Sequence, residues 1–224
     1  MSSERILAGF VSAARFEDIP ASAHVVVKQM MLAVIGAGIA GSSEDGCREI
    51  QNYVLGWGGH NEATVFFTDR KAPAHLAALA NGIVCRALDY CDAMAPGLHM
   101  GSSIVPVALA IAERGGGCSG RELLTALAVG AEVGARLNLS EAEYHGFDPT
   151  GVAGVFAAAA TACRLRKLPI DKTLQALALA FNRAGGSFQS NVDGSLAVIW
   201  LNQEPTCRSR RSRIMRVFTF PHDR

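Results

Sequence analysis

The sequence lacks the features that mark several large classes of protein. Its six cysteines contain no C-x-x-C pair, and this scattered spacing argues against zinc sites, iron–sulfur clusters and a disulfide framework. Only 18% of the 224 residues are charged and the net charge is +1, which argues against a nucleic-acid partner. Glycine loops that bind nucleotides are absent in their required contexts. We therefore expect no metal, no cofactor and, since free thiols suit a reducing compartment, a cytoplasmic location.

The N-terminus gives no sign of a targeting segment. MSSERILAGF has an early acidic residue and no long apolar core, unlike a secretory signal. The longest uncharged runs, near Gln29–Ser43 and Thr150–Cys163, are shorter than the roughly 20 residues that span a bilayer. We expect a soluble chain with no membrane partner.

What the sequence has in abundance is apolar residues at helical spacing. Half of the residues are hydrophobic and 23 are glycine, a composition that favours helices packed closely through small side chains. Only EATVFFT at 62–68 resembles a strand, which we expect to be an isolated extended segment. The pattern predicts an all-α fold, an antiparallel bundle of six to seven helices. We expect them at about 20–43, 44–55, 73–90, 104–114, 119–137, 149–168 and 171–186.

Three of these helices begin with a recognisable local signal. Ser119 and Glu122 have the spacing of a capping box, Pro149 stands at a first helical turn, and Asp171 is expected to cap the last helix.

The composition changes after Gln203. Residues 204–224 hold six Arg, no Lys and two acidic residues, without a helical apolar period. They are either a disordered basic tail, a salt-sensitive binding arm, or residues foreign to the fold, as after a frameshift. We therefore predict one helical domain over 1–203, followed by a separate Arg-rich tail.

The densest group of chemically active side chains lies at Cys85–Ser103, which reads CRALDYCDAMAPGLHMGSS. An apolar helix carrying Asp89 and Asp92 passes into a Pro/Gly loop that ends at His99, and two serines follow. Carboxylates beside an imidazole and hydroxyls, where a helix gives way to a loop, are what acid–base chemistry needs.

His99 is the best candidate for proton transfer, because imidazole titrates near neutral pH. The alternative is a loop histidine that bonds the backbone. Asp89 could orient His99 or bind substrate, or be only a polar residue at a helix end. Asp92 shares a helical face with Asp89 if the helix persists, and is otherwise a solvated loop acid.

Ser102 and Ser103 stand at the start of the next helix. There they could donate hydrogen bonds to a substrate carboxylate, because the helix dipole favours anions. Simple N-capping is the alternative. Cys91 is expected to pack rather than act as a nucleophile, since no sequence feature implies a lowered thiol pKa.

The stretch around Asp89 and His99 resembles the signature of the MmgE/PrpD family, typically A-L-D-(F/Y)-D-D-T-H, a short loop and H-P-S-S. Residues 64–90 resemble the family's lead-in to this motif, and the stretches at 117–137 and 146–165 resemble the segments that follow it, in the same order. The resemblance covers about residues 20–203.

The resemblance implies an N-terminal helical domain of a homodimeric lyase that dehydrates or decarboxylates a small polycarboxylate, such as 2-methylcitrate or cis-aconitate. Epimerisation is a third reaction that the sequence leaves open. We expect Asp89 and His99 to be catalytic, and Asp92, Ser102 and Ser103 to bind substrate. Relatives are about twice as long, so we also expect that the family's α/β lid domain is lacking and the helical domain truncated.

The chain departs from the family pattern at several positions. Cys91 replaces an Asp, Ala93 replaces a Thr and Asp148 stands where relatives often have His. After D-G-S, where relatives often have a basic residue, the chain reads Leu196-Ala-Val-Ile-Trp200. The alternative interpretation is therefore a catalytically silent helical fragment that retains only dimerisation or binding.

Overall fold

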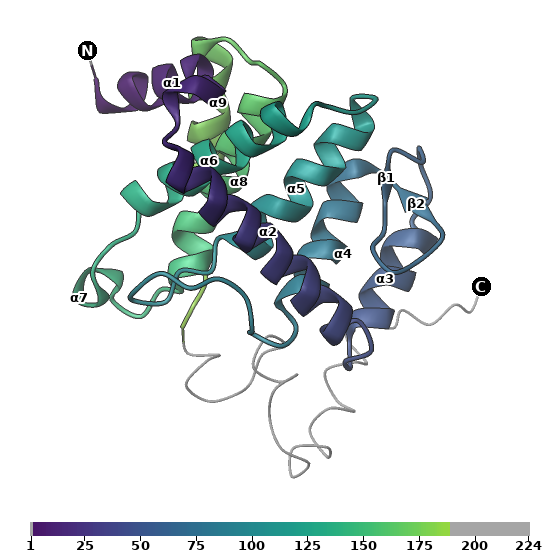
Figure 1. Ribbon diagram of the computed structural model, residues 1–224. Helices are drawn as coiled ribbons and strands as arrows, with labels where there is room; N and C mark the ends of the chain where they lie inside the picture. Colours follow the sequence, from purple (N-terminus) through teal and green to yellow (C-terminus); the bar gives the residue numbers. More distant parts are fainter. Residues whose placement is uncertain (1, 189–224) are drawn as a thin grey trace.

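Helices make up most of the structure, a computed structural model that describes residues 2–188 (Figure 1). Within this range there are nine α-helices, one 3₁₀ helix and one two-stranded sheet. The all-α prediction is confirmed. The prediction for 204–224, and the D-G-S segment, lie outside the described residues. The elements are α1 (Ser3–Ala13), η1 (Phe16–Asp18), α2 (Ala21–Gly41), α3 (Cys47–Gly56), β1 (Ala63–Thr64), β2 (Lys71–Ala72), α4 (Ala74–Arg86), α5 (Gly101–Arg114), α6 (Gly120–Arg136), α7 (Glu141–Tyr144), α8 (Pro149–Leu165) and α9 (Ile170–Phe181).

Seven of these helices correspond to the seven predicted segments, and α1 and α7 are additional. The capping box at α6 is confirmed, since the Glu122 amide donates to Ser119 Oγ at 3.2 Å and the Ser119 amide to Glu122 Oε2 at 2.9 Å. Pro149 is the first residue of α8, as predicted. The prediction that Asp171 caps the last helix is wrong. The N-cap of α9 is Pro169, and Asp171 instead pairs with Arg5 at 3.1 Å.

The extended segment at 62–68 is not isolated. β1 pairs with β2 in an antiparallel register that sets Ala63 opposite Ala72. The buried side chain of Asn81, on α4, accepts from the Phe66 amide at 2.7 Å and donates to the Thr64 carbonyl at 2.9 Å. This side chain from a distant helix satisfies backbone groups that a two-stranded ladder leaves open.

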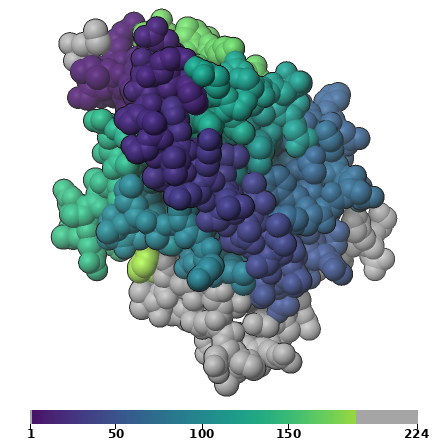
Figure 2. Space-filling view, in the orientation of Figure 1, coloured from purple at the N-terminus to yellow at the C-terminus, as the bar shows by residue number. Residues whose placement is uncertain are grey.

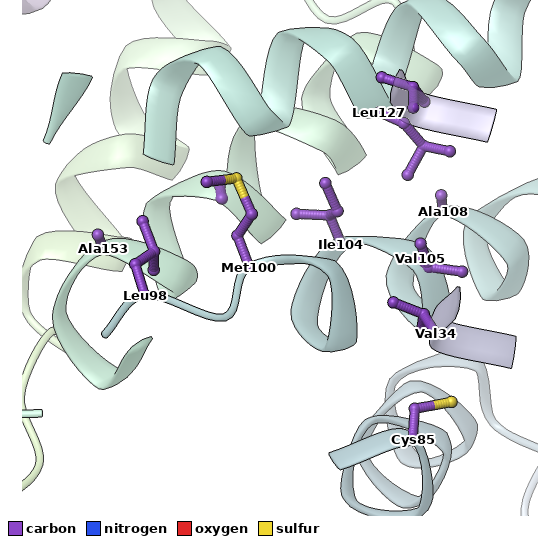
Figure 3. Close-up of a cluster of buried hydrophobic side chains, with 11 residues drawn as sticks. Val34, Cys85, Leu98, Met100, Ile104, Val105, Ala108, Leu127 and Ala153 are labelled. Carbon is purple, nitrogen blue, oxygen red and sulfur yellow. The ribbon is translucent and has the colours of Figure 1, made fainter. Parts of the chain in front are cut away.

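Helix α5 occupies the centre of the fold. It contacts α4, α8, α6 and α2, and its inward face carries Ile104, Val105 and Ala108, all fully buried. These residues join Leu127 of α6 and Val34 of α2 in the largest core cluster (Figure 3). Because α5 is held on several sides, the position of its N-terminus is set by the surrounding helices.

The contact between α6 and α8 shows why the chain is rich in glycine and alanine, because small residues allow the two helices to approach closely. A Cβ atom at Gly130 would lie only 1.9 Å from Thr161 Oγ1 and 2.8 Å from the Ala157 carbonyl oxygen. A Cβ at Gly134 would meet the Ala157 methyl group at 3.1 Å. The two helices therefore approach so closely that one of them needs glycine at the contact.

Helix α2 lies across the surface of the molecule (Figure 2). It is 21 residues long with a mean hydropathy of 1.6, enough by length and composition alone to cross a bilayer, which corrects the expectation that every apolar run is too short. One such helix is weak evidence for a membrane span, since core helices of soluble proteins have the same properties. Its inner face buries Val27, Val34 and Ala37 against the rest of the bundle.

Candidate active site

The helix that carries the acidic motif ends earlier than its apolar pattern suggests. α4 ends at Arg86, and Asp89 adopts a left-handed backbone conformation with φ = 52°, which Asp tolerates better than most residues. The helix therefore does not persist to Asp92, and the condition under which Asp89 and Asp92 would share a helical face is not met. Both carboxylates lie on the loop of residues 87–100 that connects α4 to α5.

The Asp89 carboxylate lies between the side chains of Arg86 and His99. Its Oδ1 forms an ion pair with Arg86 Nη1 and lies 3.8 Å from His99 Nε2. The Arg86 side chain is only 15% exposed, and the same Nη1 lies 3.8 Å from the Cys91 sulfur. The predicted pair Asp89 and His99 is thus brought together, with Arg86 as a third member that sequence reasoning missed.

The His99 ring is held in one orientation. Its Nδ1 lies 2.7 Å from the Asp92 carbonyl oxygen, and because a carbonyl can only accept, Nδ1 carries the hydrogen. In the neutral ring, Nε2 then holds the free lone pair and faces Asp89. The His99 amide donates to Thr150 Oγ1 at 3.0 Å, which ties the loop to α8. His99 thus has the tautomer that a general base needs.

The Asp92 carboxylate accepts a hydrogen bond from the backbone. Both of its oxygens accept from the Gly101 amide at 3.0 Å, at the start of α5, where the helix dipole favours an anion. Burial raises the pKa of this carboxyl, although the Gly101 amide and His99 oppose the shift. A Cβ at position 101 would lie 2.1 Å from Asp92 Oδ1, so this arrangement requires glycine there. Asp92 supports the site structurally, and its predicted role in binding substrate stays a prediction.

Ser102 and Ser103 border a cavity of about 890 Å³ between α4, α5 and α8. Arg86 and Thr150 line the same end of it. The Ser102 hydroxyl donates to the His99 carbonyl at 3.2 Å, and neither serine is the N-cap of α5, which is Met100. The capping alternative is therefore wrong. Both serines line the cavity, but Ser102 is buried and its hydroxyl is already bonded, so Ser103 is the better placed of the two to meet a ligand.

The remaining motif residues have structural roles. Asp148 caps α8 by accepting from the amides of Thr150 and Gly151 at 3.0 and 3.1 Å. Burial raises the pKa of the Cys91 thiol, as expected for a packing residue. Among residues 2–188 no group of three or more His, Cys, Asp or Glu side chains is placed to hold a metal ion.

Two functional candidates escaped the sequence reasoning. Thr150 follows the cap residue Asp148 and could have been suspected from the resemblance at 146–165. Arg86 has no comparable signal, because a basic residue in the last turn of a helix is common and its burial depends on the loop that folds back over it.

Comparison with known proteins supports the resemblance. Residues 5–198 match the MmgE/PrpD N-terminal domain. The chain belongs to the MmgE/PrpD family. Human cis-aconitate decarboxylase is 32% identical to it over 166 residues, and the mouse enzyme is 30% identical over the same length. These matches cover 70% of this chain and 34% of each enzyme, so the chain spans about a third of the length of the curated relatives it matches.

Proposed function

We propose that this member of the family forms the helical part of a lyase that acts on a small polycarboxylate, such as 2-methylcitrate or cis-aconitate. Family membership and the similarity to two decarboxylases support lyase chemistry. The observation that carries the proposal is the fixed tautomer of His99, whose Nε2 faces Asp89. Asp89 in turn pairs with Arg86, which lines the cavity.

In a dehydration, His99 Nε2 would remove the proton from the carbon next to a substrate carboxylate, and a second group would protonate the departing hydroxyl. In a decarboxylation, carbon dioxide leaves, and protonated His99 would deliver a proton to the carbon left behind. In both cases a positive charge resides on the imidazole during the reaction, and Asp89 at 3.8 Å stabilises it. Neither sequence of steps calls for a redox change.

The substrate carboxylates would bind at the Arg86 end of the cavity. Arg86 offers a guanidinium, which suits a carboxylate, and Ser103 adds a hydroxyl donor at the same end, whereas the Ser102 hydroxyl already donates to the His99 carbonyl. The α5 N-terminus lies there as well and favours an anion. Asp92 contributes through the Gly101 amide rather than by a contact of its own.

We also propose that two copies of the chain associate as a homodimer in the cytoplasm. The outward face of α2 carries Val25, Val26, Leu32 and Ile39, each more than half exposed. Apolar side chains repeated along one helix face are typical of a protein interface. Light scattering of the purified chain tests this proposal, and a monomer at micromolar concentration would contradict it.

A catalytically silent fragment is the second candidate. Arg86 already neutralises Asp89, and Asp148, where relatives often have His, is occupied in capping α8. Ala93 offers no hydroxyl in place of the family Thr. These observations favour a chain that binds or dimerises without turnover.

Turnover of 2-methylcitrate and cis-aconitate by the purified chain separates the two candidates. The lyase proposal expects activity that is lost in His99→Ala and kept in His60→Ala, a matched change at an exposed loop histidine. If the chain is inactive both alone and with the remaining part of a relative supplied, the lyase proposal fails and the silent fragment stands.

A further inference from the structure

The cavity beside Arg86 is longer and more apolar than a compact polycarboxylate requires. We infer that it accommodates an alkyl chain, and that the substrate class is a polycarboxylate with such a chain on one of its carbons. The inference rests on the proposed function, because it assigns the substrate of the same site.

Three helices supply most of the cavity lining, and Asp148, Gly186 and Ser187 supply the rest. α5 contacts both α4 and α8 and supplies the floor, while α4 and α8 form the two walls. The lining residues on α4 recur every three or four positions, as in Leu79, Ile83 and Arg86, which is the spacing of one helix face. The cavity therefore follows the helix axes and is a groove.

The direction of the groove follows from contacts at its two ends. Near Arg86, a Cβ at Gly82 would lie 3.3 Å from the Ser102 carbonyl oxygen at the start of α5. At the other end, Glu62 accepts from the Ala74 amide at 2.9 Å and pairs with Arg114 at 3.2 Å. α4 and α5 are thus antiparallel, and the groove runs from Arg86 to His75, about 16 Å at 1.5 Å per residue.

Polar and apolar groups are separated along this length. The Arg86 end carries the guanidinium, the hydroxyls of Ser102, Ser103 and Thr150, and the Asp148 carboxylate, which accepts from the amides of Thr150 and Gly151. The middle is lined by aliphatic side chains from all three helices, namely Ala78, Leu79, Ile83, Val107, Ile111 and Val155. His75 and Arg114 end the apolar stretch.

This separation matches a ligand with carboxylates at one end and a hydrocarbon chain at the other. The hydrogen bonds of Arg86 to described residues all use Nη1, toward Asp89 and Cys91, which leaves donors of the guanidinium for a carboxylate. A compact polycarboxylate would fill only this end and leave the apolar walls in water, whereas an alkyl chain would bury them.

Calorimetric titration of the full chain with methyl-, butyl-, octyl- and dodecylsuccinate tests the inference. Each added methylene is expected to tighten binding by about twofold to fourfold, the upper value being that of full burial, until the chain reaches His75 and Arg114. Octylsuccinate should bind far more tightly than citrate. The inference would be overturned if none of these compounds binds, which is the result expected if a protein segment fills the groove. It would also be overturned if the affinity does not depend on chain length.

Variants place the ligand in the groove. Ala158→Phe narrows the middle and should weaken octylsuccinate at least tenfold while leaving methylsuccinate unchanged. Ala159→Phe, the same change at a neighbouring alanine outside the lining, should preserve the dependence on chain length.

Arg86→Gln should weaken the binding of every member of the series by the same factor. If Ala158→Phe does not fold, Leu79→Ser serves instead, because that side chain is half exposed. An unchanged chain-length dependence in these groove variants would overturn the inference.

The two proposals fail separately. Binding that depends on chain length without any turnover would contradict the lyase function alone. Turnover of 2-methylcitrate by a chain with no preference for alkyl length would contradict the groove assignment alone.

Discussion

Asp89 Oδ1 lies 3.8 Å from His99 Nε2 because the backbone turns left-handed at Asp89, shortly after α4 ends at Arg86. That turn directs the carboxylate toward both Arg86 and the imidazole. A helix continued through Asp89 would remove this approach, so one backbone conformation creates the candidate site.

Replacement of Asp89 by glycine separates the backbone role from the chemical role. Asp89→Gly loses the ion pair with Arg86 but adopts φ = 52° without strain, so its melting temperature should fall only by the contribution of that pair, while turnover falls on the order of a hundredfold. Asp89→Val loses the same pair and is also strained at this φ, so its melting temperature should be lower than that of Asp89→Gly. A glycine variant with full turnover would exclude a chemical role for the carboxylate.

The buried Asp92 carboxyl makes stability depend on pH. Its pKa is raised in the folded state, so the folded chain binds this proton more tightly than the unfolded chain. The contribution to stability is present below the ordinary pKa of about 3.9 and is lost as the pH rises through the raised folded value. Asp92→Asn keeps an oxygen for the Gly101 amide. Its stability relative to the parent chain should therefore increase as the pH rises from the ordinary pKa of Asp92 through the raised pKa in the folded chain.

Melting temperatures of both proteins from pH 3 to pH 8 measure this difference. Other carboxyls, such as Glu122 with a pKa lowered to about 2, change the melting temperatures of both proteins equally, so their effect cancels in the comparison. A constant difference between the two proteins at all pH values would contradict the prediction.

Glycine at the contact of α6 and α8 is required by space. Gly130→Ala places a methyl group against Thr161 and the Ala157 carbonyl and should cost about 1–3 kcal/mol, the range for overpacking. The matched change Gly36→Ala on α2 meets no atom within 4 Å and should stabilise by roughly 0.5–1 kcal/mol through helix propensity. Urea unfolding of the two variants checks the opposite signs.

The cysteines should differ in reactivity. Burial raises the pKa of Cys47 to about 11 and that of Cys85 to about 12, whereas Cys118 is exposed on a loop. Because the thiolate is the reactive form, iodoacetamide at neutral pH should modify Cys118 well before Cys47, Cys85 or Cys91. Peptide mass spectrometry gives the order, and early labelling of Cys91 would show that the loop opens.

The sequence by itself determined the helical fold, most helix positions and the family. Apolar spacing of about 3.6 residues and local signals such as Ser119 with Glu122 act within one segment, so they can be interpreted without a partner. The gathering of acids, imidazole and hydroxyls between Cys85 and Ser103 also follows from the order of residues alone.

Only the tertiary structure decided where those side chains lie and what they contact. The Asp92 carboxylate, which was expected to bind substrate, accepts from the Gly101 amide, and its role toward substrate stays a prediction. Arg86 looked like an ordinary residue in a last helical turn, yet the loop folds over it and pairs it with Asp89. The groove needs three helices at once. Each of these outcomes depends on distant backbone segments that compete for the same polar group or enclose the same space, which residue spacing does not encode.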